Sequence, residues 1–188
     1  MIPQRLTAAE LLDSAGLLAE LLTDVVAGGA SLGFLVPLAH GEAAAWWRGL
    51  APAVTEGRLA VWAVLDGDRC LGTVSLAFTD KPNGRHRAEV AKLMVHPAAR
   101  GRGLARTLLT HLEDAALDAG VSLLVLDTET DSPAETLYRT AGWTRAGVIP
   151  DYATDPTGTP HPTTLFYRRL EARDPVRTPQ YRSAARYS

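Results

Sequence analysis

Cysteine and long apolar runs are almost absent from this chain of 188 residues. The single cysteine, Cys70, excludes a disulfide within the chain and a cysteine-rich metal site. No stretch approaches the roughly 20 consecutive apolar residues that a membrane-spanning helix needs. Asp13 and Glu20 interrupt the N-terminal apolar region, which does not fit the core of a secretory signal. We therefore expect a soluble cytoplasmic protein in which Cys70 packs on a strand.

An excess of charge of one sign is also lacking, because 19 basic residues stand against 21 acidic ones, for a net charge of −2. This balance predicts no general affinity for nucleic acid or for anionic membranes. The five histidines do not have the spacing of metal ligands, so we expect no metal. A serine hydrolase is not expected either, because the chain has no Gly-x-Ser-x-Gly turn.

A basic loop interrupted by glycines follows an apolar strand and precedes an amphipathic helix. Gly101 and Gly103 lack a Cβ, which allows a tight turn and a close approach of the backbone to a ligand. The first amides of the helix, together with Arg100 and Arg102, suit a pyrophosphate. The dinucleotide fingerprint does not fit, because Arg106 stands where its third glycine should be.

Hydrophobic periodicity predicts the remaining elements. Helical spacing indicates helices over residues 7–27, 42–54, 103–119 and 132–141. The third of these should bury Leu104, Leu108, Leu112, Ala115 and Ala119. A short first strand is expected before the first helix, and apolar runs predict further strands over 58–65, 71–79, 87–95, 121–126, 144–149 and 163–170. The run 121–126 is nearly all apolar, which is typical of a strand covered on both faces.

This order of elements predicts an α/β fold. We expect a mixed, mostly antiparallel sheet of about seven strands, with about four helices on both faces. Residues 1–170 would form a single domain. Residues 171–188 have no periodic pattern, and we expect a flexible tail.

The basic loop resembles the acetyl-CoA-binding motif of the GNAT N-acetyltransferase superfamily, in which Arg or Gln is followed by x-x-Gly-x-(Gly or Ala). Arg100, Gly103 and Ala105 fall on these positions, with alanine where glycine is commoner. The predicted order of elements is also that of the GNAT fold. The resemblance implies acetyl-CoA as cosubstrate, its pantetheine arm pairing like an added strand with the chain before the loop. The implied cofactor contacts are Leu93, Met94, Val95, Arg100, Gly101, Arg102, Gly103, Leu104 and Ala105.

Glu89 lies on the strand that leads into this loop. Strand alternation places it on one face with Ala91, Leu93 and Val95 if no bulge intervenes. Some members of the superfamily have their general-base glutamate at this offset from the motif, which implies the same role here. The alternative is a salt bridge with a neighbouring arginine, at position 85 or 87, or a solvated strand edge.

Asp127 is the first polar residue after the run 121–126, and so is expected at the carboxyl end of a buried strand. Ligands of open α/β sheets bind at such ends, although a turn aspartate is an equal reading from position alone. Together with Glu89, it would hold a substrate ammonium and remove its proton. Acetyl transfer requires this step because only the neutral amine attacks a thioester.

Residues 131–143 resemble a second GNAT element, Asn-x-x-Ala-x-x-Leu-Tyr-x-x-x-Gly-Phe, with Asp131 in place of Asn and Trp143 in place of Phe. The resemblance implies that Tyr138 protonates the departing CoA thiolate and that Asp131 contacts the cofactor. Without the resemblance, a tyrosine on an amphipathic helix indicates core packing.

Other segments, including 28–34, 81–84 and 161–163, resemble a GNAT member that acetylates the amino group of a β-lactam-containing amino-acid toxin. This implies direct transfer of acetyl, in a ternary complex, to a primary amine of a small molecule such as a toxin or antibiotic. Ser31, Phe34 and Tyr152 would then bind the substrate together with Glu89 and Asp127.

Two alternatives stay open at this point. A protein or peptide acetyltransferase needs an open groove, which the bulky residues Phe34, Trp46 and Trp47 are expected to close. A non-catalytic acyl-CoA-binding sensor would keep the loop but would not need both acids and Tyr138. The oligomeric state is left open as well.

Overall fold

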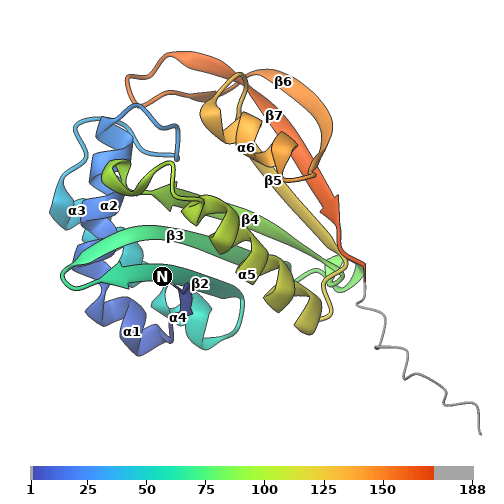
Figure 1. Cartoon of the computed structure of the whole chain (residues 1–188), viewed down its shortest axis with the longest axis horizontal. Helices are drawn as coiled ribbons and strands as arrows, with labels where there is room; N and C mark the ends of the chain where they lie inside the picture. Colours follow the sequence, from blue (N-terminus) through green and yellow to red (C-terminus); the bar gives the residue numbers. More distant parts are fainter. Residues whose placement is uncertain (1, 172–188) are drawn as a thin grey trace, which may run out of the picture.

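A seven-stranded sheet in the order β1-β2-β3-β4-β5-β7-β6 forms the centre of the computed structural model, which describes residues 2–171 (Figure 1). Only β4 and β5 are parallel, and all other neighbours are antiparallel. The expected mixed, mostly antiparallel sheet is therefore confirmed. The flexible tail predicted for 171–188 lies outside the described residues, except for its first residue.

The strands are close to those predicted, with differences at their ends. Their bounds are β1 Gln4–Arg5, β2 Leu59–Asp66, β3 Arg69–Phe78, β4 Arg87–Val95, β5 Leu123–Glu129, β6 Thr144–Thr154 and β7 Pro160–Arg169. The prediction was wrong for β5, which begins two residues after Val121 and continues through Asp127 to Glu129. Asp127 is thus a strand residue paired with Leu165 of β7, and not a residue that follows the strand.

The helices are shorter and more numerous than predicted. Their bounds are α1 Ala8–Asp13, α2 Ala15–Ala27, α3 His40–Gly49, α4 Ala51–Thr55, α5 Leu104–Asp118 and α6 Pro133–Thr140, with 3₁₀ turns at Pro82–Gly84 and Pro97–Ala99. The first predicted helix is divided at Ser14, whose ψ of 0° lies outside the helical range. The second is divided at Leu50, where Pro52 starts a new helix because its fixed φ suits a first turn.

Two apolar cores cover the two faces of the sheet. One packs α1–α4 against β2 and β3, with Leu11, Leu18, Leu22 and Trp47 fully buried. The other packs α5 and α6 against the opposite face. On α5, the predicted burial of Leu104, Leu108 and Leu112 is confirmed, but Ala116 is buried in place of Ala115 and Ala119. Among residues 2–171, no helix is long and apolar enough to cross a membrane.

A β-bulge in β4 decides which way the side chains of this strand point. The pairing with β3 shifts between Thr73 and Ser75, and Lys92 has a φ of +52°. Leu93 and Val95 therefore pack against the core under α5, on the side opposite Glu89. Leu93 and Val95 were expected on the face of Glu89 only if no bulge intervened, and the observed bulge inserts an extra residue that reverses the alternation after Ala91.

β4 and β5 pair only over Arg87–Glu89 and Leu123–Val125. Beyond these pairs the two strands diverge toward the loop that follows β4 (Figure 1). The edge of β4 that faces β5 is left without a strand partner in this region. One face of β5 is also uncovered, since Leu123 and Val125 are only partly buried and line a cleft. The prediction of a strand covered on both faces was therefore wrong.

Candidate active site

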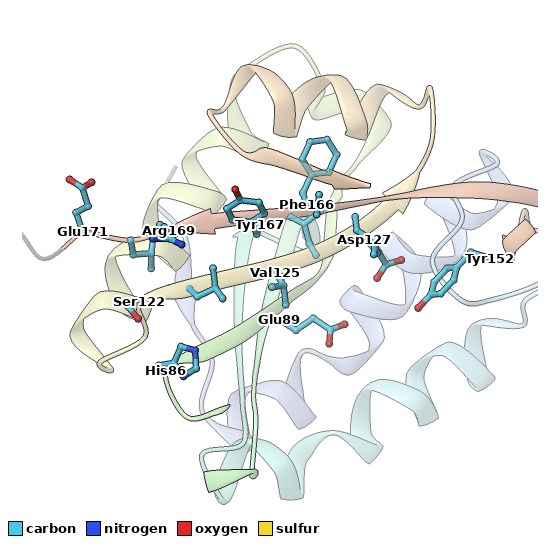
Figure 2. A pocket seen from close by; sticks show the side chains of 15 residues that line it. His86, Glu89, Ser122, Val125, Asp127, Tyr152, Phe166, Tyr167, Arg169 and Glu171 are labelled. Carbon is cyan, nitrogen blue, oxygen red and sulfur yellow. The ribbon is translucent and has the colours of Figure 1, made fainter. Parts of the chain in front are cut away.

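Glu89 and Asp127 lie on the same face of neighbouring strands at the point where the strands diverge. Glu89 is level with Val125 in the parallel register, and Asp127 follows two residues further along β5. Both side chains are exposed, and among the described residues neither Arg85 nor Arg87 forms an ion pair with Glu89. Figure 2 shows both carboxylates directed toward the same space as the phenol of Tyr152.

These side chains line a cleft of about 950 Å³ over the uncovered face of β5 and β7. Leu165 lies beside Asp127, and the paired residues Val125 and Tyr167 lie between Asp127 and the far end of the cleft. Arg169 and Glu171 lie at that far end (Figure 2). The cleft can therefore hold an amine at the acids and accommodate the rest of an extended molecule along the strands.

Tyr138 is buried on the opposite face of β5, with an exposed fraction of 6%. Its ring centroid lies 5.7 Å from that of Trp143 and 6.0 Å from that of Phe166. Burial raises the pKa of Tyr138, and the carboxylate of Asp127 raises it further. The phenol therefore stays protonated at neutral pH, as a proton donor must, and it also packs in the core.

The glycine loop between β4 and α5 is open on the side where an anion would bind. Gly101 and Gly103 have φ values of +75° and +76°, and a Cβ added to either would meet no atom within 4 Å. Gly103 caps α5 without a side-chain hydrogen bond, so no side chain occupies the first amides of the helix. Arg100, Leu104 and Ala105 line a neighbouring hollow of about 240 Å³.

Arg102 and the end of β4 flank this loop. The side chain of Arg102 is exposed, and the Nε of Arg100 donates to the carbonyl oxygen of Val95 over 3.4 Å. Met94 and Val95 pair with β3 on one edge only, which leaves the other edge open toward β5.

Asp131 follows β5 with a φ of +61°, a conformation that few residues other than glycine adopt. Its backbone N–H donates to the carboxylate of Glu135 over 2.5 Å, and Thr164 donates to the same carboxylate over 3.1 Å. The start of α6 has one half of a capping box. Ser132 accepts from the N–H of Glu135, but Glu135 bonds Asp131 and not the capping residue.

The loop between α2 and α3, residues 28–39, carries two of the predicted substrate residues. The hydroxyl of Ser31 donates to the carbonyl oxygen of Thr154 over 2.8 Å, next to Tyr152, whose side chain is 53% exposed. Phe34 meets Trp46 edge to face at 5.2 Å. Trp47 is fully buried and donates to a backbone carbonyl of α2, so it cannot close the groove as expected.

Sequence reasoning missed Lys92. Its ammonium donates to the carbonyl oxygen of Leu32 over 2.8 Å and lies 5.7 Å from the ring of Phe34 and 5.4 Å from that of Trp46. A single basic residue in the middle of an apolar strand was the available signal. The five histidines join no cluster of three or more His, Cys, Asp or Glu side chains suited to a metal within residues 2–171.

The model of the Acetyltransferase (GNAT) family matches residues 37–143, more than half of the chain and including the glycine loop. The chain belongs to the GNAT acetyltransferase family. The match includes β4, α5, β5 and α6, which carry Glu89, Asp127 and Tyr138.

Curated GNAT relatives match over part of their length. The chain is 33% identical over 88 residues to N-acetyltransferase 8F1 of Rattus norvegicus, covering 46% of this chain and 40% of that protein. It is 39% identical over 69 residues to an IAA acetyltransferase of Azospirillum brasilense, covering 36% of this chain and 45% of that protein. The chain thus spans less than half of the length of these relatives.

Solved GNAT structures share the whole fold at low identity. A ribosomal-protein-alanine N-acetyltransferase from Brucella melitensis matches with a TM-score of 0.70 and 22% identity, covering 90% of this chain and 100% of that one. A putative acetyltransferase from Salmonella typhimurium, solved with acetyl-CoA, matches with a TM-score of 0.71 and 20% identity, covering 93% and 98%. These likenesses establish the GNAT fold, and the predicted fold class is confirmed.

Proposed function

We propose that this protein is an acetyl-CoA-dependent N-acetyltransferase that acts on a primary amine of a small molecule. The observation that carries this proposal is the position of Glu89 and Asp127, two exposed acids on one face of adjacent strands, directed into one cleft. Two carboxylates side by side attract an ammonium group, and either can then accept its proton.

The glycine loop fits the phosphates of acetyl-CoA, which would supply a thioester as the acetyl donor. The open conformation of Gly101 and Gly103 leaves room for a ligand against the backbone. The uncapped amides of α5, together with Arg100 and Arg102, provide donors and positive charge for an anion. The free edge of β4 from Leu93 to Val95 offers backbone groups to an extended arm.

Each side chain has a defined role in the proposed direct transfer. Glu89 and Asp127 hold the acceptor ammonium and take one proton, which leaves a nitrogen lone pair to form the new N–C bond. Tyr138 gives its phenolic proton to the sulfur as the C–S bond breaks, the acylated nitrogen releases its surplus proton to the second carboxylate, and solvent returns a proton to the phenolate.

The acceptor that we favour is an amino-acid-like toxin or antibiotic. The support is the resemblance of segments 28–34, 81–84 and 161–163 to the tabtoxin resistance protein, which acetylates a β-lactam-containing amino acid. Ser31 and Tyr152 belong to segments beside the acids, where such an acceptor would make further contacts. The relatives are named for different acceptors, such as IAA and ribosomal-protein alanine, and do not favour one class.

A peptide acceptor is the second candidate, because the cleft continues along β5 and β7 beyond the acids. Leu123, which is paired with Arg169 near the far end of the cleft, lies four strand residues from Asp127. This separation is about 13 Å. This length accommodates a few residues of an extended peptide.

The test is the release of free CoA from acetyl-CoA with a panel of amines: amino acids including the β-lactam toxin, aminoglycosides and short peptides. The variants Glu89→Gln, Asp127→Asn and Tyr138→Phe are assayed in parallel, with acetyl-CoA affinity measured by calorimetry. We expect release with one class of amine and a loss of about 10²-fold or more in kcat for the acid variants. Their acetyl-CoA affinity should stay unchanged.

Tight acetyl-CoA binding without release with any amine would support the sensor and contradict the proposal. Release with peptides alone would replace the small-molecule acceptor by the peptide acceptor.

A further inference from the structure

Lys92 and the 28–39 loop form a contact that nothing in the acetyl-transfer scheme uses. Lys92 is one of only two lysines in the chain, the other being Lys81. It occupies the bulge of β4 with a φ of +52°, which is unfavourable for a residue with a side chain. The bulge directs the side chain of Lys92 toward α3 and the 28–39 loop. The contacts that this side chain makes there must therefore stabilise the positive φ of Lys92.

Three contacts hold the ammonium. It donates to the carbonyl oxygen of Leu32 over 2.8 Å, and it lies within 6 Å of the ring centroids of Phe34 and Trp46. A cation over two aromatic rings is attracted by both, and more strongly when it is partly removed from water. Phe34 belongs to the loop and Trp46 to α3, so one side chain joins β4 to both.

The same loop is anchored on the other side of the cleft. The hydroxyl of Ser31 donates to the carbonyl of Thr154 over 2.8 Å, and the N–H of Val36 donates to the carbonyl of Pro156 over 2.9 Å. The loop therefore spans from the half of the sheet that carries Glu89 to the half that carries Asp127. On the β4 side, its anchor is Lys92.

The Lys92 ammonium lies in the electrostatic field of Asp127 and Glu89. Burial lowers the pKa of the Lys92 ammonium, and the negative charges of Asp127 and Glu89 oppose this lowering. The three groups are therefore electrostatic neighbours, although the contacts of Lys92 are with the loop and with α3.

We infer that Lys92 is a positioning residue, which fixes the 28–39 loop over the β4 bulge and thereby sets where an acceptor meets Glu89 and Asp127. This inference rests on the proposed function for its kinetic consequence only. Its structural part, the anchoring of the loop, holds whatever the acceptor is.

The test compares Lys92→Met, Lys92→Arg and the control Lys81→Met in the full chain. Methionine keeps an unbranched side chain of similar length against the rings but removes the donor and the charge. Arginine keeps both a cation and a donor. Lys81 is exposed, precedes a 3₁₀ turn and does not line the cleft.

Amide hydrogen exchange gives the first readout. In Lys92→Met, residues 30–36 should exchange about tenfold faster than in the wild type, the effect of losing one hydrogen bond of ordinary strength. The helices α2 and α5 should be unchanged. Lys92→Arg should restore part of the protection, and Lys81→Met should behave as the wild type. Unchanged exchange in 30–36, or faster exchange throughout the chain, would overturn the inference.

Steady-state kinetics give the second readout. Lys92→Met should raise the KM for the acceptor about tenfold, with a smaller change in kcat and an unchanged acetyl-CoA Kd. Faster exchange in the loop with an unchanged acceptor KM would also overturn the positioning role. If the wild type acetylates no amine, the proposed function fails, while the exchange experiment still decides whether Lys92 anchors the loop.

Discussion

The hydroxyl of Ser31 donates to the backbone carbonyl of Thr154, a residue 123 positions later in the chain. This bond fastens the 28–39 loop to the end of β6, close to Tyr152 and the mouth of the cleft. The wall of the candidate acceptor site thus depends on a contact between two segments far apart in the sequence.

Replacing Ser31 by alanine should raise the acceptor KM about three- to tenfold, because the carbonyl of Thr154 loses its donor and the loop loses one anchor. The acetyl-CoA Kd should change less than the acceptor KM, because the hydroxyl of Ser31 bonds Thr154 and not the glycine loop. Thr110→Ala is the matched control, because that hydroxyl bonds only within α5. An equal rise in KM in both variants would contradict the role given to Ser31.

Replacing Gly103 by alanine should weaken acetyl-CoA binding at least about tenfold. Its φ of +76° costs about 1–2 kcal/mol for a residue with a Cβ, so the loop would leave its anion-binding conformation. Calorimetry with acetyl-CoA measures the effect.

Gly16→Ala provides the control for that experiment. Gly16 lies in α2, and an added Cβ there meets no atom within 4 Å, so alanine should stabilise the fold by about 0.5–1 kcal/mol. Its acetyl-CoA affinity should equal that of the wild type. Full acetyl-CoA affinity in Gly103→Ala would contradict the proposal that the glycine loop binds the phosphates of acetyl-CoA.

Stability should fall as the pH rises above about 9. Burial raises the pKa of Cys70 from its ordinary value of 9.0 to about 12. The folded state therefore keeps a proton that the unfolded chain releases, so the stabilisation is complete below pH 9 and is lost between pH 9 and 12.

Denaturant titrations at pH 8 and pH 10.5 measure this loss. In the wild type, Cys70 should contribute about 1–2 kcal/mol to the difference in unfolding free energy. Cys70→Ala should show a smaller difference, although Tyr138, whose pKa is also raised by burial, still contributes. An identical pH dependence in both proteins would show that Cys70 ionises freely in the fold.

Replacing Glu135 by alanine should lower the unfolding free energy by about 2–3 kcal/mol. Its carboxylate accepts from the N–H of Asp131 and from the hydroxyl of Thr164, and hydrogen bonds to a charged acceptor are strong. Glu135→Gln should cost less, because the amide oxygen still accepts. Chemical denaturation measures the unfolding free energy of the two variants. Equal losses of unfolding free energy would show that the negative charge of Glu135, and not its hydrogen bonding, stabilises the fold.

The fold and the main residues of the candidate site could be predicted from the sequence because local signals mark them. Gly28 and Gly120 end helices, and the motif around Arg100 and Gly103 marks the start of α5. The sequence leaves a bulge in β4 open but does not place it at Lys92, because no glycine or asparagine marks the positive φ.

The extent of β5 was missed for a related reason. Asp127 looks like the end of a strand, but its backbone is held by pairing with Leu165 of β7, a partner 38 positions away. The contacts of Ser31 and Lys92 with distant segments likewise arise only when the two halves of the sheet are brought together. Pairings at such separation leave no periodic trace in the local sequence.

The short ladder between β4 and β5 has a mechanical consequence. β4 and β5 are held together only at Arg87–Glu89 and Leu123–Val125. A rotation of one strand against the other about these pairs would displace Val95 and Glu129, at the ends of the strands, more than the paired residues. The 28–39 loop contacts β4 through Lys92 and the end of β6 through Thr154. We therefore expect a molecule bound between β4 and β5 to change the position of this loop at the mouth of the cleft.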